Sequence, residues 1–270
     1  MPTTGNTKPF KSYEEQIAIL KSRGLIINDN ENAKAILKKM NYYRLSAYSL
    51  TLRKNDVFYP GVTIEDIVAL YDFDADLRKI VFEFSAVAET SARAYIEDEL
   101  KHAAFLKELF TAINRSSDIF VIHHKEERGA IYPIWVAIEE TTFGSLSKFY
   151  KNMLLSDRTS IAKEFYGLPR EYIENFMQCA SVARNIAAHG GRFYNRIKLS
   201  PAVKMPKKMQ CIDKDRPAAY IYAIYALLPD TEKYSMLHAL SRAFRRHPFA
   251  DEKYLGLPAN WFHLFESMQS

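Results

Sequence analysis

The feature that most constrains the fold is a long run of apolar residues spaced three and four apart. It extends from Ile64 to about Leu100 through Ile67, Val68, Tyr71, Leu77, Ile80, Val81, Phe84, Val87 and Tyr95. This spacing places side chains on one face of an α-helix, whereas a half-buried strand would show strict alternation. The pattern therefore predicts one very long helix, with a kink expected near Asp72–Asp76.

Shorter helical patterns cover most of the remaining chain. Ser12 with Glu15, and Thr63 with Asp66, have the spacing of capping boxes, and Gly24 predicts the end of the first helix. Only 9 of 270 residues are glycine, which argues against a turn-rich β fold. Further helices are expected over residues 31–51, 133–152, 157–166, 169–189, 218–228, 231–246 and 260–268. The predicted fold class is all-α.

Composition indicates how the chain is organised into domains and in which cellular compartment the protein resides. With 48% hydrophobic residues, the chain can bury a sizeable core. We expect an N-terminal helical hairpin over residues 1–60, packed as one unit with a helical domain over residues 61–270. The longest strongly apolar run, Ala218 to Leu228, is too short to cross a bilayer. Two cysteines, Cys179 and Cys211, fit a reducing compartment. These features predict a cytoplasmic protein with no membrane partner.

Charge is concentrated in one segment. The whole chain carries +5, which is too mild to indicate a partner. Residues 192–216, which show no helical period, contain eight basic and two acidic residues and net +6. The segment's RNA-binding candidates are Arg196, Lys198, Lys204, Lys207 and Lys208. A salt-dependent contact with an RNA backbone and a solvated charged loop both explain this composition.

The strongest candidate for chemistry is an Arg-Asn-x3-His motif formed by Arg184, Asn185 and His189. His189 ends a polar stripe on a predicted helix, and Gly190-Gly191 should terminate that helix. A helix C-terminus favours the charged imidazolium, and a histidine that gains and loses a proton near neutral pH suits acid–base catalysis. Arginine supplies a fork for binding phosphate. A hydrated helix face or a dimer contact would give the same polar stripe.

The segment RNIAAHGGRFYNR resembles the signature of the Abi-like bacterial abortive-infection proteins, a branch of the HEPN superfamily. Other segments agree in the same order along the chain. They include KPFKSYEEQIAILKSRGLIINDNENAKAILKKMNYYRLSAY, YDFDADLRKI, PIWVAIEETTFGSLSKFY and LGLPANW. Gly190-Gly191 departs from the family, which often has a bulkier residue there. The resemblance covers nearly the whole chain.

The resemblance implies a HEPN-like helical bundle that acts in phage defence as a metal-independent endoribonuclease and toxin. The motif would face its copy across a homodimer interface. His189 would act on the ribose 2′-hydroxyl or the leaving oxygen, Arg184 would hold the phosphate, and Asn185 would position either. No cofactor or metal is expected. The alternative is a catalytically inactive or antidote-controlled RNA-binding toxin component, with RNA or protein as the antidote.

Several further residues are weaker candidates. Supporting roles are assigned to Glu89, Arg93, Arg192, Tyr194 and Asn195, although Glu89 with Arg93 also has the spacing of an ordinary helix-surface ion pair. A second Arg-x4-His pair, Arg242 with His247, fits a solvated helix end or an accessory phosphate contact. His123-His124 lacks the carboxylates or thiolates that would complete a metal site, so a loop pair is expected.

Overall fold

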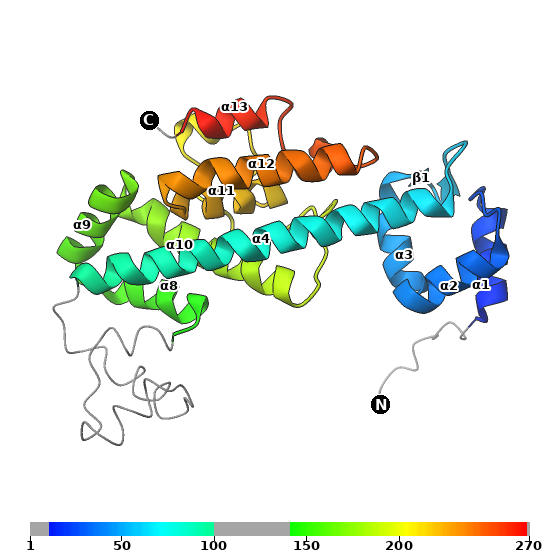
Figure 1. Cartoon of the computed structure of the whole chain (residues 1–270), viewed down its shortest axis with the longest axis horizontal. Helices are drawn as coiled ribbons and strands as arrows, with labels where there is room; N and C mark the ends of the chain where they lie inside the picture. The colour runs from blue at the N-terminus through cyan, green and yellow to red at the C-terminus, as the bar shows by residue number, and fades with distance from the viewer. Residues whose placement is uncertain (1–10, 100–140, 269–270) are drawn as a thin grey trace, which may run out of the picture. The chain divides into compact units, whose positions relative to one another are not determined.

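The computed structural model describes residues 11–99 and 141–268, which are predominantly helical (Figure 1). The all-α prediction is confirmed. Contacts within the chain define two compact units, and the division falls inside a long helix after Asp74. The first unit contains residues 1–74 and 247–250, and the second contains residues 75–246 and 251–270.

The first unit is built from short helices and one small hairpin. Its elements are α1 (Tyr13–Ser22), α2 (Asn30–Met40), α3 (Tyr42–Tyr48), the 3-10 helix η1 (Ser49–Thr51), β1 (Arg53–Lys54) and β2 (Val57–Phe58). The capping box of α1 is present, with the Glu15 amide donating to Ser12 Oγ and the Ser12 amide donating to Glu15. Gly24 follows α1 at φ +88°, as expected of a helix-terminating glycine.

Two details of this unit differ from the sequence prediction. The helix expected over residues 31–51 is broken at Asn41, whose φ of +57° is incompatible with an α-helix and whose side chain caps α3. The hairpin of β1 and β2 was not predicted, because strands of two residues have no readable alternation. Its turn residues, Asn55 and Asp56, both have positive φ, which is the conformation of a tight hairpin turn.

The long apolar pattern forms α4 (Ile64–Glu99). Thr63 and Asp66 cap its start, since the Asp66 amide donates to Thr63 Oγ1 and the Thr63 amide donates to Asp66. The helix is continuous through Asp72–Asp76, where a kink was expected. Partners elsewhere accommodate two of the carboxylates in this stretch: Asp74 accepts from the Tyr48 hydroxyl at 2.7 Å, and Asp76 pairs with Arg246 at 2.8 Å.

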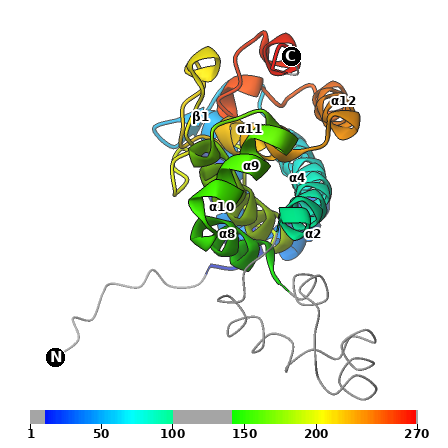
Figure 2. The same cartoon turned by 90° about the vertical axis from the view of Figure 1, so that its left-hand side faces the viewer.

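The second unit packs helices around a core that includes one wholly buried helix. Beyond its part of α4, its elements are α8 (Phe143–Asn152), α9 (Leu155–Tyr166), α10 (Arg170–Ala188), η3 (Lys207–Met209), α11 (Pro217–Leu227), α12 (Asp230–Arg246), η4 (Glu252–Tyr254) and α13 (Trp261–Glu266). Every residue of α11 is buried. Helix α10 packs against α8, α9 and α11, and Figure 2 shows it among these neighbours.

Most expected ranges in this unit are confirmed to within two residues. The exception is the helix expected over residues 133–152. Its described part starts at Phe143, because Thr142 is extended and caps α8 by accepting from the Ser145 amide. Residues 191–216 form an irregular loop that contains only η3, as the lack of periodicity predicted. None of the helices described here has the length and apolarity needed to span a bilayer.

Candidate functional site

The candidate site lies at the C-terminal end of α10, where glycine shapes the chain. His189 is the last, half-helical residue, and Gly190 follows in the left-handed conformation at φ +66°. The Gly191 amide donates to Ile186 O at 2.8 Å, and the Gly190 amide donates to Ala187 O at 3.1 Å. This pair of bonds is a Schellman motif, which satisfies two carbonyls at the helix end. The predicted termination at Gly190-Gly191 is confirmed.

Gly191 is needed for a second reason, which is close packing. A Cβ atom at this position would lie 2.9 Å from Ile186 Cγ2 and 3.1 Å from Ile186 O. Because both distances are shorter than ordinary contacts, only glycine lets the chain turn back so tightly against the last turn of α10. Gly191 therefore fixes the direction in which the chain leaves His189.

His189 and Asn185 form an exposed polar face at this end of the helix. They are four residues apart and therefore lie one above the other. The rest of the predicted polar stripe is less uniform. Ser181 is buried and donates to Gln178 O, while Glu174 is tied by ion pairs to Arg158 at 3.3 Å and Lys151 at 3.4 Å. The accessible part of the stripe near the helix end is therefore Asn185 with His189.

The Arg184 side chain contacts this polar face, but it leaves α10 in a different direction from the His189 side chain. Five residues separate it from His189, which is about 140° around a helix. Its Nη1 donates to Asn185 Oδ1 at 3.3 Å, and its guanidinium lies over the Phe82 ring of α4, 5.5 Å from the centroid. A cation over an aromatic face is weakly attracted to it. Asn185 therefore connects the arginine to the face that carries the histidine.

Glu89 and Arg93 form a largely buried ion pair on α4. Their side-chain atoms are 2.7 Å apart, and Arg93 also donates to Thr141 O, just before α8. No hydrogen bond or ion pair joins Glu89 to Arg184 within the described chain. The position of the pair favours a role in fixing the start of α8 against α4, and the expectation that Glu89 orients Arg184 gains no support from these contacts.

The residues after the motif hold the following loop in place. Tyr194 is 1% exposed, and its hydroxyl accepts from the Asp251 amide at 3.2 Å. The Asn195 amide donates to Tyr254 O at 3.1 Å, and Asn195 adopts a φ of +55°. Both contacts attach the loop to the region of η4. Arg196 lies nearby and donates to Arg192 O at 3.4 Å, so the two arginines begin the basic segment together.

The lysines of the basic segment are exposed, and one residue of α10 that the sequence did not single out secures their loop. Lys198, Lys204, Lys207 and Lys208 all face solvent. Asn175 Oδ1 accepts from the Lys204 amide at 2.6 Å, and Asn175 Nδ2 donates to Ala202 O at 3.0 Å. No spacing rule could reveal Asn175, because its partners lie 27 and 29 residues away.

The remaining candidates differ in how far the structure describes them. Arg242 is exposed on α12, and the His247 ring packs edge-on against Phe73 at 5.9 Å. His123-His124 lies outside the described residues. Within residues 11–99 and 141–268, no three His, Cys, Asp or Glu side chains are grouped so that they could hold a metal ion.

The site and fold define a helical protein with an exposed Asn–His face at a glycine-terminated helix end, next to a basic loop. The Abi-like protein family matches residues 35–195, a segment that begins in α2 and ends within the loop after α10. The match covers more than half of the chain, so this chain belongs to the Abi-like protein family. Membership supports a part in abortive infection. Neither the curated proteins nor the solved structures gave a significant match.

Proposed function

We propose that this protein is a metal-independent endoribonuclease of phage defence, with a HEPN-type fold and a site shared by two copies of the chain. The observation that carries the proposal is the exposed His189–Asn185 face, with Arg184 held next to it, inside the segment that matches the Abi-like family. Exposure matters because a catalytic histidine must reach the substrate. In the described chain, the His189 ring has no hydrogen-bond partner that would occupy it.

The proposed reaction uses the RNA's own 2′-hydroxyl. That oxygen attacks the adjacent phosphorus as its proton is removed, and the bond from phosphorus to the 5′-oxygen breaks as that oxygen is protonated. The products are a 2′,3′-cyclic phosphate and a 5′-hydroxyl. His189 supplies proton transfer at one of these oxygens, and Arg184 stabilises the charge that develops on the phosphate.

The directions of the side chains support the proposal of a shared site. Arg184 and His189 of one chain diverge by about 140° around α10, so one helix end does not present both on one face. A second copy of α10 supplies whichever of Arg184 and His189 the first copy does not direct toward the RNA. The His189 of one protomer then acts as the base, and the His189 of the other acts as the acid. The basic residues Arg196, Lys198, Lys204, Lys207 and Lys208 guide the RNA backbone toward this site.

The test uses the purified full chain and a synthetic RNA that it cuts. We expect cleavage in the presence of EDTA, a cyclic-phosphate product, and no cleavage when the attacking ribose is replaced by deoxyribose. Analytical ultracentrifugation should show a dimer. A requirement for added divalent metal, or cleavage of the deoxyribose position, would overturn the mechanism. If the chain instead co-purifies with RNA and cuts nothing, it is an RNA-binding component controlled by an antidote.

A further inference from the structure

One stretch of the first unit contains no acidic residue. Residues 32–55 include six basic residues and no acidic one, whereas the whole chain has 37 basic and 32 acidic residues. The stretch covers most of α2 and all of α3 and β1 (Figure 1). Its net charge of +6 equals that of residues 192–216. The chain therefore has a second concentration of positive charge, in the compact unit that does not carry the motif.

The lysines of α2 differ in whether an acid neutralises them. Lys34 pairs at 2.5 Å with Glu14, which lies outside the acid-free stretch. Lys38 and Lys39 follow about one turn later on the same helix. Both are exposed, and neither forms an ion pair within the described residues. Their ammonium groups are therefore open to an anionic partner such as a phosphate backbone.

An exposed aromatic ring, that of Tyr43, follows these lysines. At 82%, it is the most exposed of the large apolar side chains in the described chain. The ring meets Tyr42 edge-on, with centroids 6.1 Å apart. Tyr42 is half-buried, and its hydroxyl accepts from Arg23 at 3.4 Å, so the neighbouring ring is a fixed support. Most of the Tyr43 ring is thus open to solvent within five residues of two exposed lysines.

The exposure of Tyr43 depends on the break at Asn41. In a continuous helix, Tyr43 would lie one turn after Met40, which is 3% exposed, and so on the face that packs into the core. Asn41 instead has a φ of +57° and a ψ of 157°, close to a region that is almost restricted to glycine. Strained residues of this kind are concentrated at binding and catalytic sites. The break therefore turns outward a ring that the apolar pattern would bury.

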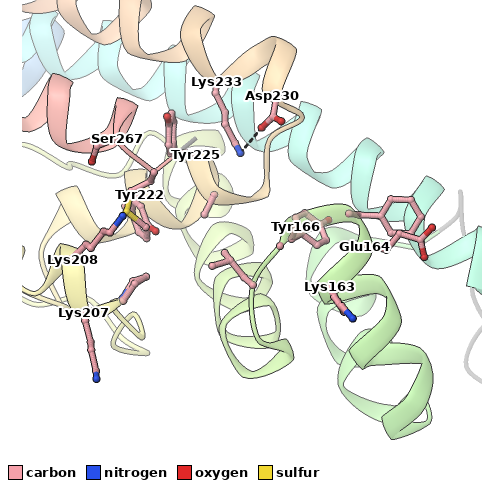
Figure 3. A pocket seen from close by; sticks show the side chains of 16 residues that line it. Lys163, Glu164, Tyr166, Lys207, Lys208, Tyr222, Tyr225, Asp230, Lys233 and Ser267 are labelled. Carbon is pink, nitrogen blue, oxygen red and sulfur yellow. Dashed lines mark hydrogen bonds and ion pairs between the residues drawn. The ribbon is translucent and has the colours of Figure 1, made fainter. Parts of the chain in front are cut away.

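Lysines beside a cavity of the second unit lack this combination (Figure 3). The cavity has a volume of about 490 Å³ and is lined by lysines from α9, η3 and α12. Its Lys233 is paired with Asp230 at 2.7 Å, and its Tyr222 and Tyr225 are each 1% exposed. Rings buried to this degree are closed to an incoming base. The cavity therefore offers no counterpart to the exposed ring and lysines of the first unit.

We propose that Tyr43, with Lys38 and Lys39, binds single-stranded nucleic acid. A base stacks on the Tyr43 ring, and the two ammonium groups contact neighbouring phosphates. Stacking requires an unpaired base, because the bases of a duplex already stack on one another. A protein partner fits this composition less well, since lysine is depleted at protein–protein interfaces. The surface lies in the first unit and the motif in the second, so the proposal does not depend on ribonuclease activity.

Fluorescence anisotropy tests the proposal with labelled single strands of about 12 nucleotides and the full chain carrying His189→Ala, so that no strand is cut. We expect Tyr43→Phe to bind within about twofold of this parent and Tyr43→Ala at least about fivefold more weakly, with Tm changed by less than about 2 °C. Tyr59→Ala removes a 47% exposed tyrosine of the same unit and should change the affinity less than about twofold. No binding by the parent, or equal affinities of Tyr43→Ala and Tyr59→Ala, would overturn the proposal.

The salt dependence of binding tests the lysine contacts. For single strands, the logarithm of the affinity falls with the logarithm of the salt concentration by about 0.7 for each phosphate contact. Combining Lys38→Gln with Lys39→Gln should therefore reduce this slope by about 1.4. Lys34→Gln, which changes the paired lysine of the same helix, should reduce it by less than about 0.3. Equal reductions in the double variant and in Lys34→Gln would refute the lysine contacts.

Competitors identify the class of partner. Polyphosphate carries the charge without bases, so it should bind the parent and Tyr43→Ala equally; a loss that matches the loss for single strands would refute stacking. Binding of the parent to anionic lipid vesicles, with no binding of single strands, would overturn the proposal in favour of a membrane surface. Matched RNA and DNA strands identify the strand that binds more tightly, and a Tyr43-dependent loss with either strand supports the proposal.

Discussion

The chain contains two Arg-x4-His pairs, and their surroundings differ. The Arg184–His189 pair ends α10 in a Schellman motif, with the histidine exposed and the arginine bonded to Asn185. In the other pair, His247 lies just after α12 and packs against Phe73, while Arg242 is exposed. The same spacing therefore places one histidine toward solvent and the other against an aromatic ring. Spacing alone does not define a site; the helix ending decides where the ring points.

The largest effect should separate the two histidines. His189→Ala is expected to lower RNA cleavage by at least 100-fold, because it removes the proton-transfer group. His247→Ala should lower cleavage by less than about threefold. Cleavage rates on one synthetic RNA, and growth of cells expressing each variant, measure this difference. Equal loss in the two variants would remove the distinction between the pairs and move the candidate site.

A smaller effect should separate the two arginines. Arg184→Lys keeps the charge but loses the planar group that bonds Asn185 and lies over Phe82, so we expect about a tenfold loss in cleavage. Arg242→Lys should leave cleavage unchanged. Phe82→Leu removes the aromatic face alone and should give part of the Arg184→Lys defect. Full activity in Arg184→Lys would mean that charge is sufficient and that the contacts of the guanidinium do not matter.

Substitutions at the C-terminal ends of α10 and α12 should change the free energy of unfolding by different amounts. Gly191→Ala places a methyl group against Ile186, and we expect it to lower the free energy of unfolding by about 1–3 kcal/mol. Pro248→Ala, at an exposed position after α12, should change it by less than about 0.5 kcal/mol. Urea unfolding of both variants measures the difference. A Gly191→Ala variant as stable as the wild type would show that the turn relaxes without cost.

The smallest expected effect concerns the reactivity of Cys179, which lies on the buried side of α10, the helix that carries the motif. Burial raises the pKa of the Cys179 thiol to about 12, so this residue is almost wholly uncharged at pH 8 and is closed to reagents. Cys211 is exposed. Ellman's reagent should therefore titrate one thiol in the native protein and two in guanidinium chloride. A Cys211→Ser control should show none in the native state; rapid reaction of Cys179 there would contradict the packing of α10.

Local sequence signals predicted much of this fold. Capping pairs such as Ser12 with Glu15 identify helix starts, and Gly190 identifies a helix end, because the chemistry acts within one turn. The break at Asn41 was missed because the apolar pattern continues across it, and only the backbone angle shows the interruption. The helix expected over residues 133–152 did not foresee a helix start at Phe143, because the cap at Thr142 lies within an otherwise helical pattern; residues 133–140 lie outside the described part of the chain.

The candidate site was predictable in part for the same reason. His189 and Asn185 share a face because of their spacing, which the sequence states directly. The contact of Arg184 with Phe82 could not be inferred, since it joins helices about 100 residues apart. The hydrogen bonds from Asn175 to the loop at Ala202 and Lys204 could not be inferred either, because tertiary packing alone brings α10 and this loop together.

The complete burial of α11 has a consequence for the order of events during synthesis. Helix α10 carries the motif, and α11, which covers it, begins 28 residues after His189. A ribosome adding about 5–20 residues each second therefore releases the motif helix seconds before its cover. Until residues 217–227 emerge, the apolar side of α10 has no complete partner. We expect this end of α10 to remain unformed in the growing chain until residues 217–227 have emerged, so that an ordered site arises later than the synthesis of the motif itself.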